Sequence, residues 1–149
     1  IHIAGRLHGP ASFVGTPLYD LLPVDFQREV YAIDANTRPQ GFRPQLTPVG
    51  VRSPLLSLED DPVENVRTWR TLPEIYWAYP VTKVKPAAEV FLVHPTQKTT
   101  DGKPMPLLAS HYYGKGYVLF CGFDETWRWR FNEADRFFAR FWSQAVYVS

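Results

Sequence analysis

The side chains best suited to chemistry are concentrated just after residue 120. An apolar run from Tyr117 to Cys121 ends in the single cysteine of the chain, and Gly122 follows it. Open α/β sheets place their sites just beyond the carboxyl ends of buried strands, so we expect a cleft at this point. The candidate cleft residues from this segment are Cys121, Gly122, Asp124, Glu125, Trp127, Arg128 and Arg130.

A cysteine nucleophile is the first chemistry to consider. A reactive thiolate needs a basic neighbour that lowers the pKa of the thiol, and no residue adjacent to Cys121 is basic. The position of Cys121 within an apolar strand is typical of a buried, unreactive cysteine. We therefore predict that its thiol is inert.

A pair of carboxylates with acid and base roles is the second chemistry. Asp124 and Glu125 are adjacent, so their side chains point in opposite directions from an extended chain. We expect one of them instead to accept hydrogen bonds from Arg128 or Arg130, beneath a cover of tryptophan at the end of the sheet. The covering tryptophans would be Trp127 and Trp129. The alternative is a binding surface, on which indole and guanidinium groups hold a ligand or a partner.

Metal binding is the third chemistry. The four histidines, His2, His8, His94 and His111, show no spacing typical of metal ligands, and we predict neither a metal nor a cofactor. His94 stands at a strand end beside Pro95, where a structural hydrogen bond is expected. His2 and His111 are expected to pack within strands. The single cysteine excludes an internal disulfide and a cysteine-based zinc site.

Composition indicates one globular domain over residues 1–149. The chain is 45% hydrophobic and 15% aromatic, which suits a substantial core. The formal net charge is +1 and there is no basic run, so nucleic-acid binding is not predicted. No apolar stretch approaches the length of a membrane span, and we expect no direct membrane insertion by this segment.

Proline and capping residues mark the start of several short helices. Thr16, Ser53 and Asp61 are each followed by proline, which predicts helices beginning at residues 17, 54 and 62. The third should run to about Leu72 with Val63, Val66 and Trp69 on one face. The last helix begins near Ala134 after an Asn132 cap. Its predicted apolar stripe is Phe137, Phe138, Phe141, Trp142, Ala145 and Val146.

Strands are predicted at residues 1–4, 75–79 and 88–93, with an edge strand or extended arm at 42–51. Residues 96–106 are expected to form a loop, because Asp101-Gly102 is a strong turn signal. Residues 107–113 and 117–121 should form a hairpin across Gly114-Lys-Gly116. These elements together indicate an α/β fold with a C-terminal hairpin and amphipathic helix.

Several motifs resemble the class I glutamine amidotransferase-like domain of bacterial proteins, which often lies beside a von Willebrand factor A module in membrane-anchored chains. The motifs are Gly15-Thr-Pro-Leu-Tyr-Asp-Leu-Leu-Pro-Val24, Leu72-Pro73, Tyr76-Trp77, Tyr79-Pro80, Tyr113-Gly-Lys-Gly-Tyr-Val-Leu-Phe120 and Asp124-Glu-Thr-Trp-Arg-Trp-Arg130. The resemblance covers nearly the whole sequence. It implies a flavodoxin-like three-layer α/β sandwich that lacks its N-terminal strands here, so that residues 1–149 are the C-terminal portion of a larger domain.

The resemblance also implies where catalytic groups should stand. A working member needs a cysteine on a sharp turn after an early strand, and a histidine and a glutamate after a later one. The corresponding turn here supplies Gly5, Arg6 and His8, which join the candidate cleft residues, but no cysteine. No histidine follows Cys121. No catalytic residue is therefore assigned.

The preferred hypothesis is a catalytically silent domain that binds a ligand or a protein within a larger bacterial protein. Its partners would be other domains of the same parent chain or a second copy, and its place would be the soluble part of a membrane-anchored protein. One alternative is an amidase or other hydrolase of the same fold that uses Cys121 or the loop with Arg6 and His8. Another is a carbohydrate-binding domain, suggested by the five tryptophans.

Overall fold

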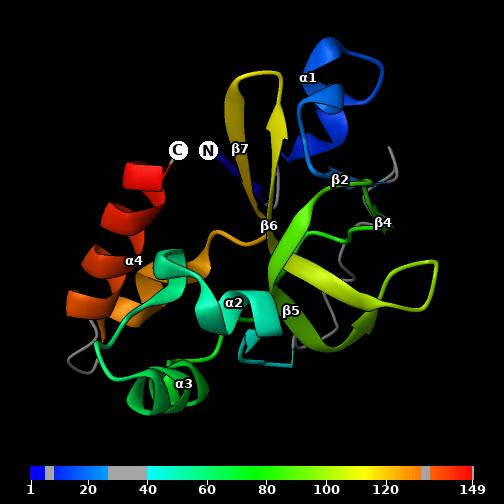
Figure 1. Ribbon diagram of the computed structural model, residues 1–149. Helices are drawn as coiled ribbons and strands as arrows, with labels where there is room; N and C mark the ends of the chain where they lie inside the picture. Colours follow the sequence, from blue (N-terminus) through cyan, green and yellow to red (C-terminus); the bar gives the residue numbers. More distant parts are fainter. Residues whose placement is uncertain (6–8, 27–39, 132–134, 149) are drawn as a thin grey trace.

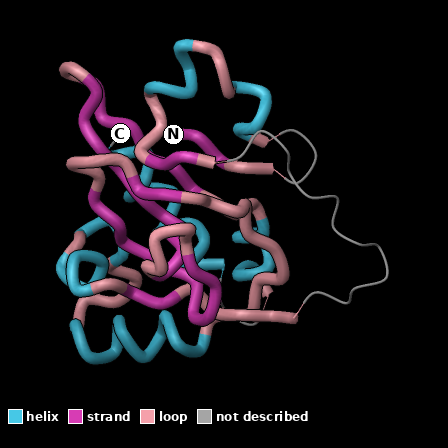
Figure 2. Tube along the Cα trace, turned by 90° about the vertical axis from the view of Figure 1, so that its right-hand side faces the viewer, coloured by secondary structure: helices cyan, strands magenta, loops and turns pink. Residues whose placement is uncertain are grey.

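The computed structural model describes residues 1–5, 9–26, 40–131 and 135–148. It has an α/β fold built on a five-stranded sheet with the strand order β1-β7-β6-β5-β3 (Figure 1). A second sheet pairs β2 (Val24–Asp25) with β4 (Lys83–Val84) in antiparallel fashion. Figure 2 shows the strands crossing the molecule with helical segments above and below them. The α/β class expected from the sequence is therefore present.

Three consecutive antiparallel strands form the centre of the large sheet. These are β5 (Glu89–Lys98), β6 (Pro104–Tyr113) and β7 (Gly116–Cys121). The hairpin between β6 and β7 is confirmed, and Gly114 at its turn has φ of 60°, a conformation that glycine adopts without a steric penalty. The short strands β1 (His2–Ile3) and β3 (Gln45–Leu46) lie at the two edges. β1 runs parallel to β7, with Ile3 opposite Cys121.

The loop expected at 96–106 is shorter than predicted. β5 continues through Lys98, and β6 already begins at Pro104, so the two strands form a second hairpin. The turn signal at Asp101-Gly102 is correct, since Gly102 has φ of 79°. The error lies in the polar residues before the turn, which continue the strand because the adjacent β6 supplies their backbone partners.

The segment 42–51 contains a helix rather than a continuous edge strand or arm. After β3, Thr47 begins helix α2 (Pro48–Arg52), and its hydroxyl accepts a hydrogen bond from the Gly50 amide at 3.0 Å. Thr47 and Pro48 are thus another pair of a capping residue and a proline that begins a helix. The segment 75–79 also differs from prediction: Ile75 makes an isolated antiparallel bridge with Phe42, and the rest forms no ladder.

The predicted helix starts at residues 17, 54 and 62 are confirmed as α1 (Pro17–Asp20), the 3-10 helix η2 (Pro54–Leu56) and α3 (Pro62–Thr71). A further 3-10 helix, η1, spans Pro10–Phe13. Asp61 caps α3 by accepting from the amides of Val63 and Glu64, each at 2.9 Å. The predicted apolar face is wrong at Val63, which is exposed. Asn65 is buried instead, and its side chain bonds to the backbone of Leu56, Leu58 and Glu59.

The C-terminal helix α4 (Asp135–Val148) packs on η2 and on the 3-10 helix η3 (Glu125–Arg130) (Figure 1). Phe141 and Ala145 are fully buried, whereas Val146 is 67% exposed, so the predicted stripe is wrong at its last position. Arg136 and Arg140 pair with Glu59 and Asp60 and thereby tie α4 to the loop between η2 and α3. The expected Asn132 cap and Ala134 start lie outside the described residues.

Candidate functional site

The candidate site lies where β1 and β7 end together. The Ala4 amide donates to the Cys121 carbonyl at 2.8 Å, which continues the parallel pairing beyond the strand. Gly122 is buried and makes two backbone hydrogen bonds. Its amide donates to the Leu107 carbonyl at 2.7 Å, and its carbonyl accepts from the Tyr79 amide at 2.6 Å. Backbone hydrogen bonds to Ala4, Leu107 and Tyr79 therefore fix the chain where it leaves β7.

Cys121 is buried in this arrangement, as predicted. Its side chain is 1% exposed, and its Sγ donates to the Phe123 carbonyl at 3.2 Å. Burial raises the pKa of the thiol to about 12, and the negative charge of Asp124 acts in the same direction. Among the described residues, no histidine bonds to this thiol. Cys121 thus lacks the solvent access that a nucleophile needs, and no base is bonded to it within the part of the chain that the structure describes.

Glu125 is the structural centre of the polar segment. One carboxylate oxygen, Oε2, accepts from the backbone amides of Tyr76 at 2.5 Å and Trp77 at 3.1 Å. The other, Oε1, accepts from Arg128 Nε at 3.2 Å and Nη2 at 3.1 Å. Both oxygens are therefore used, and the carboxylate joins η3 to the segment after α3. The expected bond between a carboxylate and Arg128 is confirmed.

Arg128 is held between two aromatic rings. Its guanidinium carbon lies 4.8 Å from the centre of the Tyr76 ring and 4.7 Å from that of Trp127. Both rings are partly exposed, and Trp127 also makes an edge contact with the exposed Phe131 at 6.0 Å. We call Tyr76, Trp127, Arg128 and Phe131 the Trp127 surface.

Trp129 does not cover the Glu125–Arg128 pair, contrary to expectation. It is fully buried, and its ring meets those of Trp69 at 5.6 Å and Phe141 at 5.5 Å. The reason is that residues 125–130 form the helix η3 and not an extended chain. Successive side chains therefore point in different directions around the helix axis, and Trp129 does not lie on the same side as Trp127. The same fact removes the argument that Asp124 and Glu125 must point in opposite directions.

The remaining candidates are not brought into one group. Arg130 pairs with Asp135 of α4 at 3.1 Å and not with either carboxylate after β7. Asp124 is exposed at the start of η3, and Gly5 is half-buried after β1. Arg6 and His8 lie outside the described residues. Sequence reasoning missed the backbone of Tyr76 and Trp77 as partners, because nothing local in a sequence predicts a contact 48 residues away.

The described histidines have structural contacts. His94 Nδ1 accepts from the amides of Thr96 at 3.2 Å and Gln97 at 3.0 Å, which confirms the predicted structural hydrogen bond, although His94 lies within β5 and not at a strand end. Burial lowers the pKa of His94 to about 4. His111 Nε2 lies 2.7 Å from the Leu21 carbonyl, and His2 packs between Phe13 and Phe120.

In the described ranges, no group of three or more His, Cys, Asp or Glu side chains is arranged to hold a metal ion. Nor do those ranges contain a helix with the length and apolar character needed to cross a bilayer. No protein-family model matches this chain, and no curated protein matches it either. The resemblance to an amidotransferase-like domain therefore stays a prediction from motifs.

Proposed function

We propose that the chain is a catalytically silent class I glutamine amidotransferase-like domain, with a flavodoxin-like architecture, that serves as a protein-interaction module in a larger bacterial protein. The observation that carries this proposal is the state of Cys121. Its thiol is buried, bonded to a carbonyl oxygen and has its pKa raised to about 12. At neutral pH the thiolate needed for amide attack is essentially absent.

The Trp127 surface supports the interaction role. Interaction sites are enriched in tryptophan, tyrosine and arginine that are held in place before the partner arrives. Here Glu125 fixes Arg128 on one side and the Tyr76 backbone on the other, so the exposed rings are already ordered. A partner that covers Trp127 and Phe131 would bury two large apolar side chains at little cost in side-chain entropy.

The decisive test of catalytic silence is ammonia release from glutamine and from simple amides by the purified domain. A working class I amidotransferase under the same conditions is the positive control. We expect release no faster than in buffer. Turnover at enzyme-like rates would reject the proposal.

The altered hydrolase is the second candidate, and thiol alkylation separates it from the silent module. Because Cys121 is the single cysteine, labelling by iodoacetamide reports on that thiol alone. We expect labelling near neutral pH to be very slow in the native protein and fast in urea. Rapid native labelling would favour the hydrolase, and Cys121→Ala, which takes up no label, is the control.

A second copy of the chain is the first partner to test. Sedimentation equilibrium over a range of protein concentrations measures self-association, and Trp127→Ala should weaken it if the Trp127 surface is responsible. Tyr147→Ala is the matched control, since Tyr147 is an exposed aromatic residue on α4. If the native protein is monomeric at every concentration, the hypothesis that the partner is a second copy is rejected. Another domain of the parent chain is then the remaining candidate partner.

Carbohydrate binding stays a prediction that rests mainly on Trp127. Trp69, Trp77 and Trp129 are buried, and the Trp142 indole donates to Thr126 at 3.2 Å. Fluorescence titration with oligosaccharides tests it. A saturable change in the native protein that Trp127→Ala abolishes would support a sugar site.

A further inference from the structure

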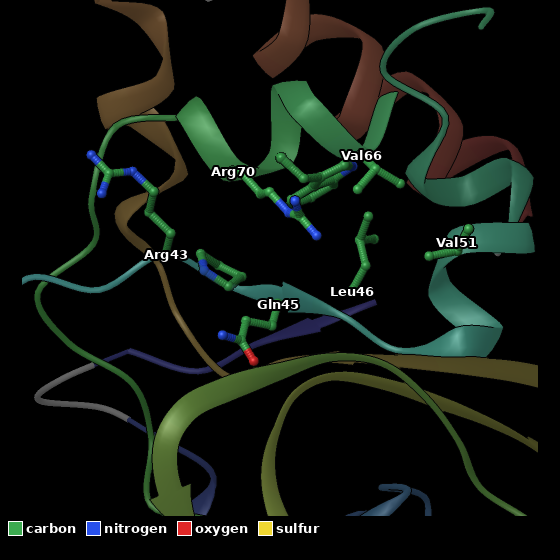
Figure 3. A pocket seen from close by; sticks show the side chains of 8 residues that line it. Arg43, Gln45, Leu46, Val51, Val66 and Arg70 are labelled. Carbon is green, nitrogen blue, oxygen red and sulfur yellow. The ribbon is translucent and has the colours of Figure 1, made fainter. Parts of the chain in front are cut away.

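A pocket of about 410 Å³ lies between edge strand β3 and helix α3, with α2 at one end (Figure 3). In the sheet, β5 and β6 separate β3 from β7, so this pocket is distinct from the site at the end of β7. Its size is within the range of pockets that bind small molecules.

One side of the pocket is apolar. Leu46 points from β3 toward Val66 of α3, and Val51 extends from α2 on the same side (Figure 3). Val51 is exposed although it is a large aliphatic residue. The packed Trp69 ring closes the inner wall, and its indole nitrogen donates to the Leu56 carbonyl at 2.9 Å. The wall is therefore a fixed surface that an apolar group can cover.

The pocket also contains a guanidinium group that has no carboxylate partner among the residues that the structure describes. Arg70 reaches from α3 toward β3, as Figure 3 shows, and no ion pair joins it to any residue that the structure describes. Arg43, at the other end, points away and is bonded to Glu74 at 2.8 Å and to the Leu72 carbonyl at 2.8 Å. Among the described residues that line the pocket, Arg70 thus provides an available positive charge beside an apolar wall.

We propose that this pocket binds a small organic carboxylate with an aliphatic body. The Arg70 guanidinium offers two parallel N–H donors, the geometry that suits a carboxylate. The aliphatic body of the ligand would contact Leu46, Val51 and Val66. A single available cation with an apolar wall favours a singly charged acid over a phosphate, which carries more charge and has no apolar part. This inference does not depend on the proposed interaction role.

Three probes of matched size or charge test the chemistry by protein-observed NMR titration. Hexanoate has both the carboxylate and the aliphatic body, hexanol has only the body, and acetate has only the charge. We expect saturable shifts for hexanoate at the amides of Leu46 and Val66, and binding at least roughly tenfold weaker for each of the other two. Hexanol binding as tightly as hexanoate, or no saturable hexanoate binding, would overturn the proposal.

Two substitutions on the same helix provide the matched comparison. Arg70→Gln removes the charge, and we expect it to weaken hexanoate binding about tenfold. Arg67→Gln removes an arginine that pairs with Glu64 and does not line the pocket, so it should leave the affinity unchanged. Equal affinities for the two variants would show that Arg70 is not the anion ligand.

A free acid and the carboxyl end of an apolar peptide share this chemistry. A tetrapeptide ending in leucine, tested as the free acid and as the C-terminal amide, distinguishes the two sources. Tighter binding of the free-acid peptide than of hexanoate assigns the pocket to peptide ends. Weaker binding assigns it to small acids, and equal binding of acid and amide peptides counts against a carboxylate site.

Discussion

Glu125 shows how one side chain can organise a surface. It satisfies two backbone amides of one segment and the guanidinium of another, and it is mostly buried. Because charged acceptors make the stronger hydrogen bonds, we expect Glu125→Ala to lower the free energy of unfolding by about 2 to 3 kcal/mol. Glu125→Gln keeps an acceptor for the amides and should cost only about 1 kcal/mol.

Urea denaturation measures both changes. Asp135→Ala is a suitable control, because its ion pair with Arg130 is exposed and should contribute little. If Glu125→Ala were as stable as this control, the bonds to Tyr76 and Trp77 would have no energetic importance.

His94 makes stability depend on pH. Burial lowers its pKa to about 4 in the folded protein, against 6.5 in the unfolded chain. Between these values the unfolded chain binds the extra proton, so stability rises with pH. The contribution is complete above about pH 6.5 and is lost as the pH falls through 4, with a maximum size of about 3 kcal/mol.

Thermal unfolding between pH 4 and 7 measures this dependence. His94→Asn retains an acceptor for the amides of Thr96 and Gln97 but does not titrate, so its curve should be flatter. Some slope should remain, because burial and the N-terminal charge lower the pKa of His2 as well. Identical slopes in both proteins would contradict the assignment to His94.

At the scale of elements, α2 depends on the absence of a side chain at Gly50. A Cβ there would meet the Phe91 carbonyl of β5 well inside contact distance. Alanine normally favours a helix by about 1 kcal/mol over glycine, yet here we expect Gly50→Ala to destabilise the protein by about 2 kcal/mol or more.

Gly116 is the matched control for that substitution. An added Cβ at Gly116 meets only the Tyr113 carbonyl, at 3.5 Å, so Gly116→Ala should change the midpoint of urea denaturation little. A stabilised Gly50→Ala variant would mean that α2 does not lie against β5 as described.

Local signals in the sequence located most element starts and few of the contacts between elements. The cap-and-proline pairs located α1, η2 and α3, since proline at the first helical position acts locally; of the three predicted caps, only the Asp61 side chain makes a capping bond. Thr47 and Pro48 give the same signal, but the prolines of residues 42–51 also favour an edge strand. The sequence prediction therefore does not include α2. For the site, burial of Cys121 and its apolar strand were predictable. The anchoring of Glu125 on Tyr76 and Trp77, and the burial of Trp129, depend on tertiary packing.

For the whole molecule, one core links the sheet to the helices. Phe141 is fully buried and contacts Trp129 and Trp69. Trp69 in turn donates to the Leu56 carbonyl of η2, and Trp129 contacts Phe123 just after β7. We expect Phe141→Ala to lower the free energy of unfolding by about 3 to 5 kcal/mol. Val146→Ala, in the same predicted stripe but exposed, should have an effect within about 0.5 kcal/mol.

Circular dichroism and tryptophan fluorescence should report one shared transition for both variants in urea. Separate transitions would indicate that α4 unfolds independently of the sheet. Comparable losses for the two substitutions would contradict the placement of the helix.

The strand order has a consequence for the time course of folding. β5, β6 and β7 are consecutive and joined by tight turns, so their ladders close small loops, whereas β1 must find Phe120 and Cys121 from the opposite end of the chain. Loop closure over such a separation is entropically costly, and pairings of this kind form late. In pulsed hydrogen exchange, the amides of β6 should therefore become protected before the amide of Ala4. Simultaneous protection would mean that the long-range pairing belongs to the folding nucleus.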